Sequence, residues 1–356
     1  MKNNWIRFLA GVIASAVLVG AFALTGGMKS GKRTDGLMYQ ASGLHPDGEL
    51  MSINGQVVSC EEYLYWLAQD CEYLASQVEG LDWNAVVTEG MTFAEYAKAD
   101  AAEAVKQHAV VRAWAQEAGI TLTDEDKAEM AAQRKQYVTY YGSEEAYLRQ
   151  LELVGISEET LELTQAGQYL YRDLYEAFST PGSGLYPDEA TLADYAAAQK
   201  YMGVYVVTVD DDKDAEGVAR DLLARWQAAE DKESEYAAIC EELGQEIGSA
   251  VTLAAVEGDP LSSAIEALEV GGMDAVIDPY EDGTCYVVMR TETDMSAVAQ
   301  TYFDVLWEQR LESAVVVTNS KLYDAIDAGT FYQALAQLRA DMAAENGDTA
   351  AQGSSK

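Results

Sequence analysis

Two β-forming runs that enclose three amphipathic helices constrain the fold of this chain more than any other feature. A Gly-Gly pair, Gly271 and Gly272, precedes the second run and predicts a tight turn. Strands that alternate with helices over so short a stretch predict one compact α/β unit, residues 201–292. The five elements follow one another along the chain as Met202–Asp210, Asp214–Glu230, Ser234–Leu243, Leu261–Leu268 and Thr284–Arg290.

Short motifs follow one another through this unit. They are Tyr205-Val206-Val207 in the first run, Tyr236 with Ile239 and Cys240 in the second helix, Ala264, Leu268 and Gly271 in and after the third, and Cys285-Tyr286-Val287-Val288 in the last run. Together they resemble the parvulin-type peptidyl-prolyl isomerase domain, as it is inserted in extracytoplasmic foldases of the PrsA and SurA kind. The resemblance implies a domain that acts on proline-containing polypeptides.

Two tyrosines stand where the resemblance implies a pair of histidines. Tyr205 and Tyr286 would then be neighbours on adjacent strands, at the floor of the proline-binding site. The histidines of the chain, His45 and His108, both precede the unit. An isomerase must lower a rotation barrier of about 18–20 kcal/mol without breaking a bond, so it depends on shape and on placed polar groups. We expect this unit to have lost catalysis, and an active isomerase that uses the two tyrosines is the alternative.

Two further positions fall where the resemblance implies the substrate site. Cys240 lies on the apolar face of its predicted helix, which indicates a packed thiol. Leu261 begins the third predicted helix. With Tyr205 and Tyr286, these residues mark the expected site, and none of the four is predicted to be catalytic.

A hairpin signal opens the region before this unit. Asn54-Gly55 lies between two short apolar runs, a pattern typical of a two-residue β-hairpin loop. Ser59 and Glu62 have the spacing of a capping box and predict the start of a helix. This combination resembles the opening of the SurA and PrsA chaperone domain, and it is a second resemblance, independent of the first.

The predicted domains are discontinuous in sequence. Residues 50–200 contain the hairpin and a series of predicted helices, two of which are predicted to begin at the caps Thr92 and Thr123. Residues 293–328 contain one more helix and the β-branched run 314–318. We expect this run to pair with the hairpin, on the far side of the inserted unit. The predicted fold is therefore α+β, with a mostly helical, discontinuous chaperone domain into which a parvulin-like α/β domain, residues 201–292, is inserted.

Residues 1–33 are expected to target the chain and to take no part in the fold. Lys2 and Arg7 precede an unbroken apolar run, residues 8–24, which is close to the length that spans a membrane. No cysteine directly follows the candidate cleavage site at residues 21–23, so a lipoprotein anchor is not expected. We predict an N-terminal membrane anchor or a cleaved signal peptide, and a body on the extracytoplasmic face of the membrane or secreted.

The remaining segments connect or end these domains. Residues 34–49 are polar and are predicted to be a linker. An amphipathic pattern predicts a last helix over residues 329–344. Residues 345–356 are rich in small and polar side chains and are predicted to be a disordered tail.

The acidity of the chain limits its partners. Its formal net charge of −37 opposes binding to nucleic acid or to anionic lipid through the general electrostatic field. Such a charge favours cationic, unfolded polypeptides, or it only keeps the surface solvated. The four cysteines and two histidines have no spacing typical of a metal site, so neither a metal nor another cofactor is expected.

Tyrosine is abundant, with 22 residues in the chain, and a ring with a polar tip suits adaptable contacts to peptides. Six tyrosines on the predicted helices could line a groove for polypeptide clients or only pack in the core. They are Tyr137, Tyr140, Tyr141, Tyr169, Tyr171 and Tyr175. The function that the resemblance implies is a chaperone or foldase for unfolded or extended polypeptides, and an active isomerase or an adaptor for one folded partner is the alternative.

Overall fold

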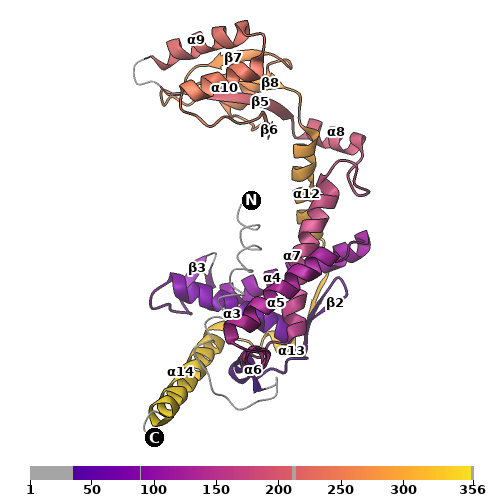
Figure 1. Ribbon diagram of the computed structural model, residues 1–356, viewed down its shortest axis with the longest axis vertical. Coiled ribbons are helices and arrows are strands. Elements are labelled where there is room, and N and C mark those ends of the chain that lie inside the picture. The colour runs from indigo at the N-terminus through magenta and orange to yellow at the C-terminus, as the bar shows by residue number, and fades with distance from the viewer. Residues whose placement is uncertain (1–34, 89, 211–213, 354–356) are drawn as a thin grey trace. The chain divides into compact units, whose positions relative to one another are not determined.

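The computed structural model of the protein describes residues 35–88, 90–210 and 214–353, and its fold is α+β and mostly helical, as predicted (Figure 1). The predicted signal or anchor, residues 1–33, lies outside the described residues. None of the helices within the described ranges combines the length and the apolar character that crossing a membrane requires. The described chain divides into two compact units: unit 1, residues 35–174 and 308–353, and unit 2, residues 175–307.

Unit 1 contains a small antiparallel sheet in which the two halves of its sequence meet. The hairpin strands β1 (Glu49–Ile53) and β2 (Gln56–Ser59) are joined at Asn54 and Gly55, which both have positive φ angles, 49° and 80°. The strand β9 (Val316–Thr318) pairs with β1, so that the order is β2-β1-β9. The predicted pairing of the hairpin with the distant valine run is therefore confirmed.

Helices make up most of unit 1. Two short strands, β3 (Val86–Thr88) and β4 (Met91–Thr92), form a separate hairpin. The buried helix α3 packs against α4, and both contact the hairpin β1–β2. The helices are α2 (Leu37–Ser42), α3 (Cys60–Gln77), α4 (Phe93–Ala118), α5 (Asp124–Tyr141), α6 (Glu144–Val154), α7 (Glu158–Ser179, whose last residues belong to unit 2), α13 (Ser320–Tyr323) and α14 (Ala328–Gly353).

Side-chain caps begin the helices of unit 1 where the sequence predicts them. Thr92 and Thr123 each form a complete capping box at the starts of α4 and α5. Ser59 caps α3 by accepting a hydrogen bond from the backbone N–H of Glu62, 3.1 Å away. The predicted reciprocal bond from the Glu62 side chain is not the one that forms, because its carboxylate is buried and pairs with Arg112 at 2.9 Å.

Two predictions about the first and last segments of unit 1 are wrong. Residues 34–49 are not only a linker, because α2 buries Leu37, Met38 and Tyr39 and packs against α14. The last helix does not end at Ala344, because α14 continues to Gly353 and includes residues predicted to be disordered. No proline interrupts these residues, so a helix that is already formed before them can continue through them.

Unit 2 is built on a four-stranded antiparallel sheet (Figure 1). The two predicted β-runs are its central neighbours, β5 (Tyr201–Val209) and β8 (Cys285–Thr291). Two edge strands were missed, because each has four residues and none of them is buried. They are β6 (Val251–Ala254) and β7 (Met273–Val276), and the order is β6-β5-β8-β7.

The helices of unit 2 cover both faces of this sheet. On the first face α9 and α10 pack on the alternate residues Val207, Val209 and Val287. On the second face the short helix α11 packs on Val204 and Val288. Side chains alternate between faces along a strand, so each run of valines serves both cores. The helices are α8 (Glu189–Ala198), α9 (Ala215–Ala228), α10 (Lys232–Glu242), α11 (Pro260–Glu266) and α12 (Met295–Glu312, whose last residues belong to unit 1).

Unit 2 is larger than the predicted insertion of residues 201–292. Leu192 of α8 is buried against Val298 and Ala299 of α12, and the tyrosines around them add to this small core. Tyr195 makes ring contacts with Tyr201, at 5.8 Å between centroids, and with Tyr302, at 5.0 Å. The helices on either side of the predicted insertion therefore fold with it.

Candidate functional site

Tyr205 lies in the core on the first face of the unit 2 sheet. Its ring centroid is 4.6 Å from that of Tyr236 and 6.5 Å from that of Trp226. Its exposed fraction is 9%, and Trp226 is fully buried. Trp226 is held in turn by a hydrogen bond of 2.8 Å from its Nε1 to the backbone oxygen of Lys232. Closely packed rings of this kind leave no room for a bound polypeptide.

Tyr286 lies on the opposite face of the same sheet. In the β5–β8 register Tyr205 faces Met289, whereas Tyr286 faces Thr208. Directly opposed residues of an antiparallel pair share a face, and Tyr286 is three positions from Met289, so the two tyrosines point to different sides. They are also about 10 Å apart along the strands, at about 3.3 Å per residue. The predicted side-by-side pair at the floor of a proline site is therefore wrong.

The other two expected site residues are divided in the same way. Cys240 is buried in the first-face core with Tyr205, so its predicted role as a packed thiol is confirmed. Burial and a hydrogen bond with Cys240 raise the pKa of the neighbouring Tyr236 to about 12. Leu261 and Tyr286 both pack against the core on the second face. The four positions thus form two pairs that the sheet separates.

Polar groups on the second face hold the start of α11. Tyr280 contacts the ring of Tyr286 edge-on at 6.0 Å and donates a hydrogen bond of 2.8 Å to Asp259 Oδ1. Asp259 Oδ2 accepts a bond of 2.6 Å from the backbone N–H of Ser262, whose Oγ accepts one of 2.9 Å from Val256. The hydrogen bond to Asp259 raises the pKa of Tyr280 to about 12, so its phenol stays protonated at neutral pH. These polar groups therefore cap the start of α11 and fix the loop that precedes it.

Unit 1 contains a half-open cavity of about 290 Å³ between α5, α6 and α7. Aliphatic and aromatic side chains form its walls, and charged side chains of both signs stand among them. The apolar walls include Met130, Tyr137, Tyr147 and Leu161, and the charged residues include Arg134 and Glu158.

Arg134 is held in place at this cavity. Its Nε is 2.8 Å from Glu158 Oε1, and its Nη2 is 2.8 Å from Glu144 Oε1. Its guanidinium lies over the ring of Tyr147, 5.5 Å from the centroid. Hydrogen bonds to Glu158 and Glu144 raise the pKa of Arg134, so the group is a permanent cation. These contacts therefore hold the planar guanidinium in one position at the wall of the cavity.

The aromatic part of the cavity is a group of packed tyrosines. The rings of Tyr137 and Tyr147 are nearly parallel, 6.4 Å apart, and Tyr141 lies 6.3 Å from Tyr147. Burial raises the pKa of Tyr147 to about 12. Tyr140, in contrast, is 67% exposed and contacts Tyr141 from outside the cavity. The group therefore combines uncharged hydroxyls with broad apolar faces.

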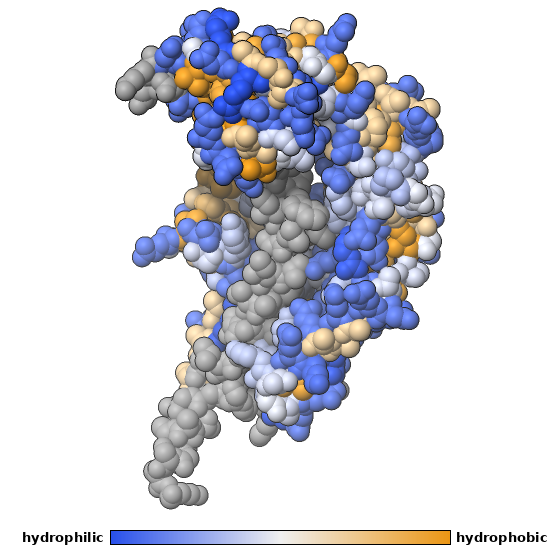
Figure 2. Space-filling view, turned by 45° about the horizontal axis from the view of Figure 1, so that its top comes forward, coloured by the Kyte–Doolittle hydropathy of each residue, from blue (hydrophilic) through white to orange (hydrophobic). Residues whose placement is uncertain are grey.

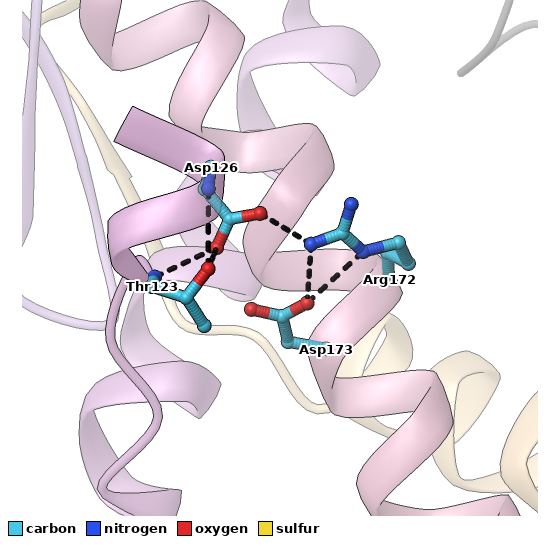
Figure 3. A network of polar contacts seen from close by, with 4 residues as sticks. All are labelled: Thr123, Asp126, Arg172 and Asp173. Atoms are coloured by element: carbon cyan, nitrogen blue, oxygen red, sulfur yellow. Dashed lines mark hydrogen bonds and ion pairs between the residues drawn. The ribbon is translucent and has the colours of Figure 1, made fainter. Parts of the chain in front are cut away.

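A polar network fixes two walls of the cavity to each other (Figure 3). Thr123 and Asp126 form the capping box of α5, with a bond of 2.7 Å from the Thr123 N–H to Asp126 Oδ2. The other carboxylate oxygen of Asp126 pairs with Arg172 of α7, which also bonds to Asp173 at 2.9 Å. Burial alone would raise the pKa of Asp126, but the bonds from Thr123 and Arg172 outweigh burial and lower it.

The six tyrosines proposed from the sequence lie in different surroundings, and Tyr140 is the exposed one. Tyr137 lines the cavity, and Tyr141 contacts its wall. Tyr169 lies beneath Arg172, at 5.3 Å, and Tyr171 is buried. Tyr175 packs against Phe303 in unit 2. Tyr137 and Tyr141 therefore lie at a cavity, where a groove for clients stays a prediction, and packing explains Tyr169, Tyr171 and Tyr175.

Sequence reasoning missed Arg134, Tyr147 and Glu158. The spacing of Met130, Arg134, Tyr137 and Tyr141 puts them on one side of α5, and this signal could have indicated Arg134. Tyr147 and Glu158 lie on other helices, so only the tertiary structure brings them to the cavity. Within the described residues, no group of His, Cys, Asp and Glu side chains is arranged to hold a metal ion.

The chain matches no family model and no curated protein. Its structure is similar to solved structures of the foldase protein PrsA from three bacteria. The structure from Streptococcus pneumoniae is 18% identical, with a TM-score of 0.26, and the match covers 70% of this chain and 93% of that one.

The other two comparisons have similar values. For Lactococcus lactis PrsA the identity is 14% and the TM-score 0.30, over 81% of this chain and 99% of that one. For Bacillus subtilis PrsA the identity is 18% and the TM-score 0.25, and the match covers 71% of this chain and 91% of that one. Identities and TM-scores this low do not define a function, which has to come from the residues of the chain itself.

Proposed function

We propose that the protein is a chaperone-like foldase that binds unfolded or extended polypeptides in the tyrosine-lined cavity of unit 1. The half-open cavity between α5, α6 and α7 is the observation that carries this proposal. Its volume of about 290 Å³ is at the lower end of the range for ligand sites, so it suits one or two side chains of a peptide. A folded partner would need a much larger matching surface.

The chemistry of the walls suits a variable polypeptide. Tyr137 and Tyr147 offer flat apolar rings with hydroxyl tips, which make contacts that tolerate different sequences. Met130 and Leu161 give apolar area, and the thioether of methionine adapts to different shapes. The net charge of −37 favours cationic, unfolded clients over acidic ones.

We propose further that unit 2 does not catalyse prolyl isomerisation. Tyr205 and Cys240 are part of a packed core, and Tyr286 and Leu261 are on the other side of the sheet. Catalysis of this rotation needs polar groups placed around the moving peptide. The hydroxyl and carboxylate groups beside Tyr286 already bond to each other and to the backbone. A scaffold or a weak peptide-binding surface is the role that these contacts support.

We place the protein on the extracytoplasmic side of a membrane or in the secreted fraction. Support comes from the basic residues and the apolar run in residues 1–24 of the sequence. Fractionation of cells that express the full chain tests this placement, together with the N-terminal sequence of the mature protein. An N-terminus after residue 24 in the culture medium would contradict a membrane anchor and leave a secreted protein.

A binding measurement with matched tyrosine variants tests the cavity. We expect Tyr137→Ala to weaken the affinity for a labelled, unfolded, cationic polypeptide by about tenfold, because it removes one wall. Tyr140→Ala is the control, since it removes an exposed tyrosine of the same helix from outside the cavity. Fluorescence anisotropy gives the affinities, and suppression of aggregation of a denatured, unrelated enzyme gives the chaperone activity. Equal effects of the two variants, or no binding by the wild type, would refute the proposal.

A further inference from the structure

The strand β9 leaves one edge of the unit 1 sheet open. It is the last strand in the order β2-β1-β9, and its only strand neighbour within the described residues is β1. The residues of this edge are exposed, with fractions of 66% for Val315, 44% for Val316 and 64% for Val317. Free edges are usually protected by a charged residue, a proline or a bulge. Residues 314–319 contain neither a charge nor a proline.

The register shows which backbone groups point outward. Val315 accepts a hydrogen bond from the N–H of Asn54, and Asn319 donates one to the oxygen of Leu50. Alternate residues of an antiparallel strand bond to the same neighbour, so Val317 also faces β1, opposite Ser52. The N–H and C=O groups of Val316 and Thr318 therefore point away from β1 and are available to an additional strand.

A row of side chains with a valine at each end crosses the sheet to this edge. Ser52 is paired with Val57 on one side and with Val317 on the other, so these three residues form one row across the sheet. Val57 is 54% exposed and Val317 is 64% exposed. A strand added next to β9 would continue this row, and a β-branched or aromatic side chain on it would pack against Val317.

We infer that β9 binds an extended segment of a client polypeptide as an additional β-strand, next to its own sheet. The preferred segment has β-branched or aromatic residues at alternate positions and basic residues on either side. This inference rests on the proposed polypeptide-binding function but assigns it a second surface in unit 1, made of backbone groups and valines.

A client segment fits this edge better than a second copy of the chain does. The strand has three residues, two of which point outward, so it can bury only a small part of the roughly 1,200 Å² that a stable protein interface buries. Two copies that each carry a charge of −37 also repel one another, whereas a basic segment is attracted. Few backbone bonds and a variable sequence suit reversible binding of many clients.

The test uses the full protein and a labelled peptide in which valine alternates with threonine between pairs of lysines. Val316→Pro removes one outward N–H and leaves the bonds to β1 intact. Val316→Thr keeps this N–H and is the matched control. We expect the proline variant to bind the peptide at least about fivefold more weakly, the threonine variant to stay within about twofold of the wild type, and an N-methylated peptide to bind poorly. The peptide should also slow amide exchange at Val316 and Thr318.

Other outcomes separate this inference from the proposed function. If Val316→Pro is misfolded by circular dichroism, Thr318→Pro takes its place, because its N–H also points outward. Peptide binding that Tyr137→Ala weakens and neither proline variant changes would overturn the β9 inference and leave the cavity function standing. No peptide binding at all, while a denatured enzyme is still protected from aggregation, would do the same. A dimer that Val316→Pro dissociates in sedimentation would replace the client with a second copy.

Discussion

Tyrosines gather in both units, but they surround an open space in unit 1 and fill the core in unit 2. Tyr137 and Tyr147 of unit 1 line a cavity of about 290 Å³. Tyr205 and Tyr236 of unit 2 are 9% and 7% exposed, with Trp226 buried beside them. The same residue type thus lines a cavity in unit 1 and fills a packed core in unit 2.

The largest expected effect comes from a truncation in the unit 2 core. We expect Tyr205→Ala to lower the free energy of unfolding of unit 2 by about 3–5 kcal/mol, as for other large aromatic residues cut to alanine in a core. Tyr205→Phe keeps the ring contacts and should keep most of the stability. Denaturant titration with hydrogen exchange at β5 and β8 measures the loss. Unchanged stability together with weaker peptide binding would make Tyr205 a site residue and remove the contrast between the units.

A smaller effect is expected from the cap that fixes the cavity wall. Thr123→Ala should lower the free energy of unfolding of unit 1 by about 0.5–2 kcal/mol, because it removes the capping hydrogen bond of α5. Thr92→Ala removes the corresponding cap of α4, which is not connected to Arg172, and is the comparison. If the network of Figure 3 shapes the cavity, only Thr123→Ala should also weaken peptide binding. Equal binding losses in both variants would mean that general destabilisation is responsible.

The same network predicts a pH dependence. The pKa of Asp126 is lowered in the folded protein, so its contribution to stability is complete above its unfolded pKa of about 3.9 and is lost as the pH falls through the folded value. Unfolding titrations from pH 6 to pH 2 should show a larger loss of stability in the wild type than in Asp126→Asn, because other carboxylates with lowered pKa values, such as Glu95 and Asp327, contribute equally to both proteins. An equal loss in the two proteins would assign the whole effect to these other carboxylates.

A still smaller effect on stability is expected at the charged side of the cavity. Arg134 is about one-third exposed, and Glu144 is more exposed, so Arg134→Gln should cost less than about 1 kcal/mol of unfolding free energy. The substitution should instead change the preference between peptides with acidic flanks and peptides with basic flanks, because it removes the fixed cation between Glu158 and Tyr147. Peptides with acidic and basic flanks, compared by anisotropy, measure this change. A large loss of stability would show that Arg134 holds the helices together rather than facing clients.

Local sequence patterns were sufficient for much of the fold. The Val-rich runs of β5 and β8, the Thr92 and Thr123 caps and the Asn54-Gly55 turn all carry their structure within a few residues. The pairing of β1 with β9 was also predictable, since an isolated valine strand needs a partner. In contrast, β6 and β7 lack a distinct pattern, because they are short and none of their residues is buried.

The candidate site was less predictable, for two physical reasons. The faces of Tyr205 and Tyr286 depend on the register of β5 with β8, and a shift of one residue reverses the face of every side chain. The cavity depends on how three helices are spaced, and Tyr147 and Glu158 reach it from helices other than α5. The spacing of Met130, Arg134 and Tyr137 indicates a common helix side but cannot tell whether the space beside it is filled.

We expect the protein to bind polypeptides without catalysing prolyl isomerisation, and one preparation can test both properties. A proline-containing peptide is titrated with wild-type protein while its binding and its cis–trans exchange are followed by NMR. We expect saturable binding, with an exchange rate that stays at the uncatalysed value of one event in tens to hundreds of seconds. An exchange rate that rises in proportion to the protein concentration would make unit 2 an active isomerase, provided that Tyr286→Ala or Tyr205→Phe abolishes the increase in a folded protein.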